Sequence, residues 1–127
     1  MIEHVSVPIS DYKKSVKFYT MALKPLGYTL ERKYPPEAAG FCEGDSTSFW
    51  IVLRKSKVQP IHVALRSKSK KAVEAFHAKA LKAGAKDNGK PGFRTDYGNN
   101  YYAAFVLDLD GNNIEACHFG AKAPKKK

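Results

Sequence analysis

Several features that mark special classes of protein are missing from this sequence of 127 residues. Its only cysteines, Cys42 and Cys117, cannot form the disulfide framework of a small secreted domain, so we expect a reducing, cytoplasmic setting. No apolar run approaches about 18 residues, so we expect no membrane span. The first residues lack a basic segment followed by an apolar core, so we expect no signal peptide.

Negative charge is also scarce, because 12 acidic residues stand against 22 lysines and arginines, for a formal net charge of +10. A basic balance occurs in nucleic-acid-binding proteins, but this chain has no arginine-rich stripe and no recognisable nucleic-acid motif. Its lysines are scattered over two predicted helices and concentrated in the end segment 121–127. We therefore expect no nucleic-acid partner, a preference for anionic small molecules, and a flexible basic tail over 121–127.

The hydrophobic pattern predicts alternating strands and helices in a single domain over residues 1–120. Apolar residues recur at three- and four-residue spacing in two segments, which predicts helices over 10–27 and 67–84. The segment 85–92, AKDNGKPG, is turn-rich. Short alternating runs predict strands over 2–9, 28–34, 40–44, 48–54, 61–67, 101–108 and 113–119.

The chain repeats itself with a shift of 58 positions, which places His4 on His62 and Phe18 on Phe76. A strand–helix unit has thus been used twice, over about 1–57 and 58–120. The sequence predicts an α+β fold of two paired βαβββ units, whose sheets curve around a cleft and whose helices cover the outer face.

Two histidines and one glutamate are expected on the face of the sheets that points away from the helices. Side chains alternate along a strand, which puts His4 and His62 opposite the apolar positions that pack under each helix. Glu115 lies in the middle of an otherwise apolar strand, where a buried carboxylate needs a partner or a metal. The three could hold a divalent metal; equally, the histidines could be structural and Glu115 could pair with Arg94 or a lysine.

These residues carry a resemblance to a known family. The histidine that opens each unit, the start EHVSVPISDYKKSVKFYTMAL and the end FVLDLDGNNIEACH resemble the vicinal-oxygen-chelate superfamily. That superfamily contains glyoxalase I, bleomycin-resistance proteins, fosfomycin-resistance thiol transferases and extradiol dioxygenases. The resemblance covers residues 2 to about 119.

The resemblance implies a divalent metal cofactor such as Fe, Mn, Zn or Ni, with His4, His62 and Glu115 as ligands and Glu115 as the catalytic residue. The fourth family position falls on Trp50, which cannot ligate a metal, so water or substrate must complete the shell. It also implies a homodimer. Trp50, Arg94 and Tyr102 are the residues expected to bind substrate.

Two functions follow from this pattern. The first is a metal-dependent enzyme, a lyase, thiol transferase or dioxygenase, that chelates a small, anionic, oxygen-rich substrate through two oxygens. The alternative is a metal-free protein of the same fold that binds or sequesters a small molecule.

Overall fold

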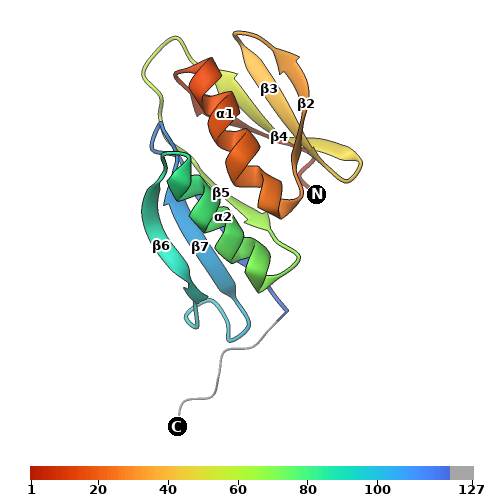
Figure 1. The fold of residues 1–127 in the computed structure, drawn as a ribbon, viewed down its shortest axis with the longest axis vertical. Coiled ribbons are helices and arrows are strands. Elements are labelled where there is room, and N and C mark those ends of the chain that lie inside the picture. Colours follow the sequence, from red (N-terminus) through yellow and green to blue (C-terminus); the bar gives the residue numbers. More distant parts are fainter. Residues whose placement is uncertain (121–127) are drawn as a thin grey trace.

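The computed structural model describes residues 1–120 and confirms an α+β fold of two βαβββ units (Figure 1). The predicted tail 121–127 lies outside the described residues. The first unit consists of β1 Val5–Ile9, α1 Tyr12–Leu23, the short 3-10 helix η1 Lys24–Leu26, β2 Thr29–Tyr34, β3 Ala38–Glu43 and β4 Ser46–Leu53. The second consists of β5 His62–Arg66, α2 Lys70–Lys82, β6 Lys86–Phe93, β7 Tyr102–Leu107 and β8 Asn113–His118.

Local chemistry sets the ends of the two long helices. The side chain of Asp11 accepts a hydrogen bond from the Lys14 amide at 3.0 Å, and the side chain of Ser69 accepts one from the Ala72 amide at 3.0 Å. Each bond satisfies an amide in the first turn that has no partner within the helix. α1 is followed by η1, and η1 ends at Gly27, whose φ of 90° is accessible mainly to glycine.

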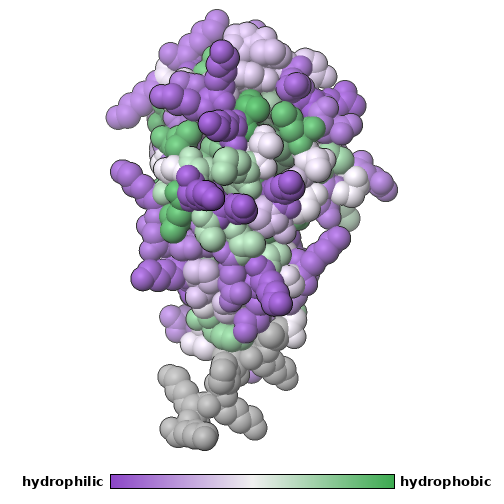
Figure 2. Space-filling view, in the orientation of Figure 1, coloured by the Kyte–Doolittle hydropathy of each residue, from purple (hydrophilic) through white to green (hydrophobic). Residues whose placement is uncertain are grey.

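Each unit forms one four-stranded sheet, with the strand orders β1-β4-β3-β2 and β5-β8-β7-β6. In each sheet the first strand runs parallel to the last strand of its unit, and the other pairs are antiparallel. The two helices touch each other and cover the same side of the two sheets (Figure 1). From that side the surface is mostly hydrophilic, with small separate hydrophobic patches (Figure 2).

The core is continuous between the units and lies between the helices and the sheets. Alternate residues of each strand contribute to it, because successive side chains point to opposite faces. Its largest fully buried side chains are mainly aromatic and branched aliphatic, and they include Tyr19, Phe18, Phe41, Phe49, Phe76, Ile9 and Leu23.

The segment predicted as turn-rich, 85–92, is largely strand β6 in the structure. The strand was not predicted because the segment contains glycines and a proline, and both residue types are depleted in central strands. β6 is an edge strand, where proline is tolerated, and Pro91 falls between Gly89 and Gly92, where the ladder to β7 is irregular. The ladder to β7 is irregular around Gly89, where the register shifts.

A cluster of polar residues ties the two units together; we call it the clasp, and it consists of Pro8, Ser10, Tyr19, Asp108, Asp110 and Asn112. Asn112 is fully buried and donates through Nδ2 to the Pro8 carbonyl and to Asp108, both at 2.9 Å. Tyr19 also donates to Asp108. Burial, reinforced by Asp108, raises the pKa of Tyr19 well above its usual value, so the hydroxyl stays protonated and keeps donating.

Among the described residues, no helix is both long enough and apolar enough to cross a membrane.

Candidate functional site

Each sheet leaves one face uncovered by helices, which we call its open face. In the first sheet this face carries Ser6, Pro8, Arg32, Tyr34, Gly40, Trp50 and Val52. In the second it carries His62, Ala64, Arg66, Phe105, Glu115 and Cys117. The predicted placement of His62 and Glu115 on this side is confirmed by the strand register.

His62 and Glu115 meet on the open face of the second sheet. His62 begins β5, Glu115 lies in β8, and these strands run side by side in parallel. The Nε2 atom of His62 is 3.0 Å from Oε1 of Glu115. The Glu115 side chain is only 3% exposed, whereas that of His62 is 52% exposed. The carboxylate is therefore held inside the protein with its imidazole partner at the surface.

Tyr101 holds the other oxygen of the same carboxylate, because its hydroxyl donates to Oε2 of Glu115. Burial raises the pKa of Tyr101 well above its usual value, and the neighbouring Glu115 and Cys117 add to this. The hydroxyl therefore remains a donor across the physiological pH range. The sequence pattern led to Tyr102 rather than Tyr101 as the expected substrate-binding residue; the register of β7 against β8, which pairs Phe105 with Glu115, shows that the odd-numbered residues share the open face.

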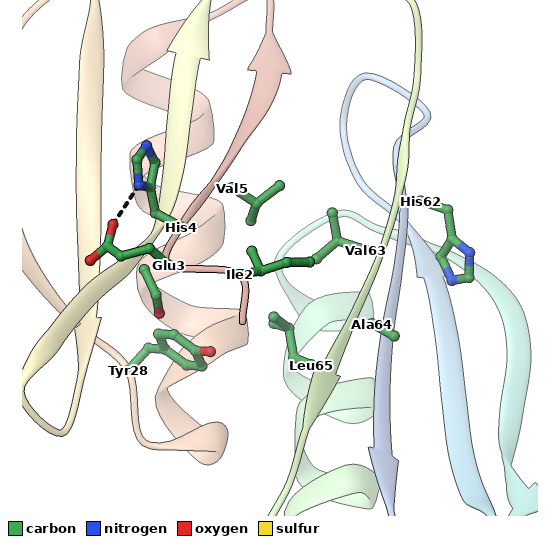
Figure 3. Close-up of a pocket in the computed structure, with 10 residues that line it drawn as sticks. Ile2, Glu3, His4, Val5, Tyr28, His62, Val63, Ala64 and Leu65 are labelled. Carbon is green, nitrogen blue, oxygen red and sulfur yellow. Dashed lines mark hydrogen bonds and ion pairs between the residues drawn. The ribbon is translucent and has the colours of Figure 1, made fainter.

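His4 does not join this pair within one chain. It precedes β1, its side chain is 54% exposed, and its Nδ1 contacts the carboxylate of the adjacent Glu3. A cleft of about 530 Å³ separates it from His62, and Ile2, Val5 and Val63 lie between them (Figure 3). The two imidazoles point away from each other (Figure 3). Within residues 1–120, no group of three or more metal-ligating side chains comes together, and of the predicted ligands His4, His62 and Glu115 only the last two meet within one chain.

Trp50 occupies the position in the first sheet that Glu115 occupies in the second. Trp50 pairs with Ser6 in the parallel ladder of the first unit, as Glu115 pairs with Ala64 in the second. Trp50 lines a hollow of about 500 Å³ together with His4. The alignment of the two halves of the sequence thus correctly paired Trp50 with Glu115. The two residues lie on separate sheets.

Arg94 lies against the open face of the second sheet. Its guanidinium sits 5.4 Å above the Phe105 ring, and Phe105 is the cross-strand neighbour of Glu115. A Cβ atom at Gly89 would lie 3.2 Å from Nη2 of Arg94, and one at Gly92 would lie 3.1 Å from Nη1. These two glycines of β6 leave room for the guanidinium, so the stacking of Arg94 on Phe105 depends on the absence of side chains at these positions.

Tyr102, which was expected to bind substrate, does not line the open face of the second sheet. It is 6% exposed and points toward α2, where its hydroxyl donates to Oε2 of Glu74 at 2.6 Å. Burial, with a smaller contribution from Glu74, raises the pKa of Tyr102 to about 12. The adjacent Tyr101, and not Tyr102, contacts Glu115.

Cys117 is expected to react with iodoacetamide more than about tenfold slower than Cys42 at pH 8. It is buried beside Glu115, and burial, with Glu115 adding to it, raises the pKa of its thiol, so little thiolate is present. Cys42 is only partly buried. Peptide mapping by mass spectrometry over time measures both rates, and Cys42→Ser provides the matched control. Equal rates would show that this region opens readily.

Comparison with known proteins agrees with this architecture. A family model described as Glyoxalase/Bleomycin resistance protein/Dioxygenase superfamily matches residues 1–116. No curated protein matches the chain.

Solved structures share the fold. A glyoxalase/bleomycin resistance protein from Albidiferax ferrireducens T118 is 26% identical, with a TM-score of 0.80 over 91% of this chain and 97% of the other. A glyoxalase-related enzyme from Fulvimarina pelagi is 15% identical, with a TM-score of 0.72 over 100% of this chain and 97% of the other. A family enzyme from Burkholderia phytofirmans PsJN is 16% identical, with a TM-score of 0.68 over 94% and 98%. The last two likenesses concern the fold alone.

Together, the family match over most of the chain and the paired βαβββ architecture lead to one conclusion: this chain belongs to the glyoxalase/bleomycin resistance protein/dioxygenase superfamily.

Proposed function

We propose that this chain is a metal-dependent enzyme that works as a homodimer, in which His62 and Glu115 of one copy and His4 of the other hold one divalent cation. Its substrate would be a small, anionic, oxygen-rich molecule that offers two oxygens to the cation. The observation that carries the proposal is the distance of 3.0 Å between Nε2 of His62 and Oε1 of Glu115.

This distance fits two ligands of a single metal ion. Bonds of about 2.1 Å from nitrogen and oxygen, meeting at about 90°, separate the two donor atoms by about 3.0 Å. Tyr101 donates to the second oxygen of Glu115, which orients the carboxylate so that Oε1, the oxygen beside His62, would be the metal-binding atom. One chain thus provides two coordination positions of suitable geometry, and a third protein ligand must come from outside it.

A second copy is a reasonable source of that ligand. The open faces of both sheets carry side chains that stay exposed in one chain, and Tyr34, at 51% exposure, is a large one. Residues next to these faces also remain exposed, including Ile2 beside His4 and Phe119 beyond β8. Exposed apolar groups of this size favour association, and pairing of two copies would cover them.

Each residue then has a distinct role. His62, Glu115 and the second copy's His4 would hold the cation, which supplies Lewis-acid polarisation of the substrate oxygens. Tyr101 orients Glu115 through the second carboxylate oxygen. Arg94 donates one hydrogen bond to the Lys90 carbonyl at 2.6 Å and keeps other N–H groups for an anionic part of the substrate.

Metal analysis of untagged protein tests the proposal. About one equivalent of a divalent transition metal per chain is expected, with loss of most of it in His4→Ala, His62→Ala and Glu115→Gln. Light scattering should give the mass of a dimer. His77→Gln is the matched control, because His77 bonds Asp87 on the helix side of the sheet. A metal-free wild type or a monomer at micromolar concentration would contradict the proposal.

One observation favours the alternative of a metal-free small-molecule-binding protein. Both oxygens of Glu115 already have partners within the chain, His62 and Tyr101, so this buried carboxylate needs no cation for its stability. If metal analysis finds none, the open faces would bind a ligand by shape and through Arg94.

A further inference from the structure

The helix side of the molecule carries most of its positive charge. α1, η1 and α2 together contain eight lysines and one acidic residue, Glu74, which is a net charge of +7 out of the chain's +10. These helices cover the side of the sheets opposite the open faces, so the proposed metal site and the proposed dimer leave them uncovered (Figure 1). A surface dominated by one sign of charge attracts ligands of the opposite sign.

A groove lies between the two helices on this side. Two hollows, of about 430 Å³ and 360 Å³, are lined by α1 or η1 together with α2, and Met21 lines both of them. We call the two hollows together the helix groove. Among the described residues that line it none is acidic, and five are exposed lysines: Lys14, Lys17, Lys24, Lys79 and Lys82.

The charges of these lysines are not balanced within the chain. None of the five forms an ion pair within residues 1–120. Like charges that are gathered on one surface repel one another, and an anion bound among them would reduce this repulsion. Lysine side chains can also line an apolar groove with their methylene groups while the ammonium groups stay in water. The rim of the helix groove is therefore suited to an anionic group.

The floor of the helix groove is apolar. Phe18 is buried, Met21 and Pro25 are partly buried, and Leu109 is 43% exposed. Leu109 packs on the end of α2, because a Cβ atom at Gly84 would lie 3.2 Å from its Cδ2. The unbranched side chain of Met21 adapts readily to the shape of a ligand. A basic rim above an aliphatic floor favours an anion that carries a flexible hydrocarbon chain.

We propose that the helix groove binds one single-chain fatty-acid anion, with its carboxylate among the lysines and its chain along Met21 and Leu109. The hydrophobic patches on this side are small and separate (Figure 2). They favour one chain over a membrane surface or a protein partner, because a protein partner covers about 800 Å² on each side. The site is complete in one chain and needs neither the proposed cation nor a second copy.

Isothermal titration calorimetry of the full chain with dodecanoate, kept below its micelle concentration, tests the proposal. Saturable binding is expected, and it should weaken as salt is added, because exposed charges are screened. Butanoate has the charge without the long chain, and dodecyltrimethylammonium has the chain with the opposite charge. Each should bind at least about tenfold more weakly than dodecanoate.

A charge-reversal variant locates the carboxylate. Lys17→Glu combined with Lys82→Glu should weaken dodecanoate binding by about tenfold or more. Lys55→Glu combined with Lys57→Glu is the matched control, because it changes the net charge equally in an exposed segment between β4 and β5. The control should keep most of the affinity. Circular dichroism checks that both variants fold.

A second variant locates the hydrocarbon chain. Met21→Gln keeps an unbranched, helix-compatible side chain but makes it polar, and it should weaken binding by about fivefold. Leu81→Gln is the matched control, because Leu81 is an exposed apolar residue of α2 that lines neither hollow. It should leave binding unchanged.

Four outcomes would overturn the proposal: no binding of dodecanoate, butanoate binding of equal strength, undiminished binding by the Lys17 and Lys82 variant, or equal losses in that variant and its control. Sedimentation with phosphatidylglycerol vesicles without binding of free dodecanoate would likewise replace it with a membrane contact. Dialysis against EDTA should leave dodecanoate binding unchanged, and its loss would place the ligand at the proposed metal site instead. The helix groove and the metal proposal can therefore fail independently.

Discussion

Mixing two metal-deficient variants, His4→Ala and Glu115→Gln, is expected to restore metal binding to about one quarter of all sites. In the proposed symmetric dimer each site would take His4 from one copy and Glu115 from the other. A mixed dimer therefore has one site with both defects and one site with none. Random exchange puts about half of the copies in mixed dimers, and half of the sites in those dimers are intact.

The experiment requires unfolding and refolding the mixture so that subunits exchange, followed by dialysis against the metal and metal analysis. Each variant refolded alone gives the baseline, and a mixture of His62→Ala with Glu115→Gln is the matched control. His62 and Glu115 of each proposed site come from the same copy, and in this mixture every copy lacks one of them. No dimer therefore contains an intact site. Equal recovery in both mixtures, or none in either, would contradict a site shared between copies.

Replacing Asn112 with alanine is expected to lower the free energy of unfolding by about 3 kcal/mol and the melting temperature by about 10 °C. The amide of Asn112 bonds the Pro8 carbonyl and Asp108, and its Oδ1 accepts from the Ile61 amide at 2.9 Å. These groups are left without this partner, and an unsatisfied buried polar group costs about 1–3 kcal/mol.

Asn113→Ala is the matched control for this measurement. It removes the neighbouring asparagine, whose Oδ1 has no hydrogen-bond partner among the described residues, so a change below about 1 kcal/mol is expected. Urea unfolding with a common m-value measures both variants. Similar losses of stability in the two variants would show that the clasp contributes little to holding the units together.

Much of the fold could be predicted from the sequence because the two halves keep the same pattern. The match of His4 with His62 and of Phe18 with Phe76 placed the first strand and the helix of both units. The strand β6 could not be predicted in this way. Its stability comes from pairing with β7 along an edge, a long-range interaction that overrides the poor strand propensity of Gly89 and Pro91.

The site was predicted only in part. Strand alternation correctly placed His62 and Glu115 on one face, because both lie within paired strands. The same alternation could not place His4, because it precedes β1, and the ladder to β4 begins at Val5. Nor could it separate Tyr101 from Tyr102, since the choice depends on the register of β7 against β8, which places Phe105 opposite Glu115.

The clasp also bears on the order in which the chain can fold. Ser10 and Asp110 bond across 100 positions of sequence, Pro8 and Asn112 across 104, and Tyr19 and Asp108 across 89. During synthesis the first unit emerges from the ribosome long before these partners exist. Its Pro8 carbonyl and Tyr19 hydroxyl must stay in contact with water until the last turn arrives. Contacts of such separation slow folding. Completion of the first unit thus depends on residues 108–112, near the end of the described chain.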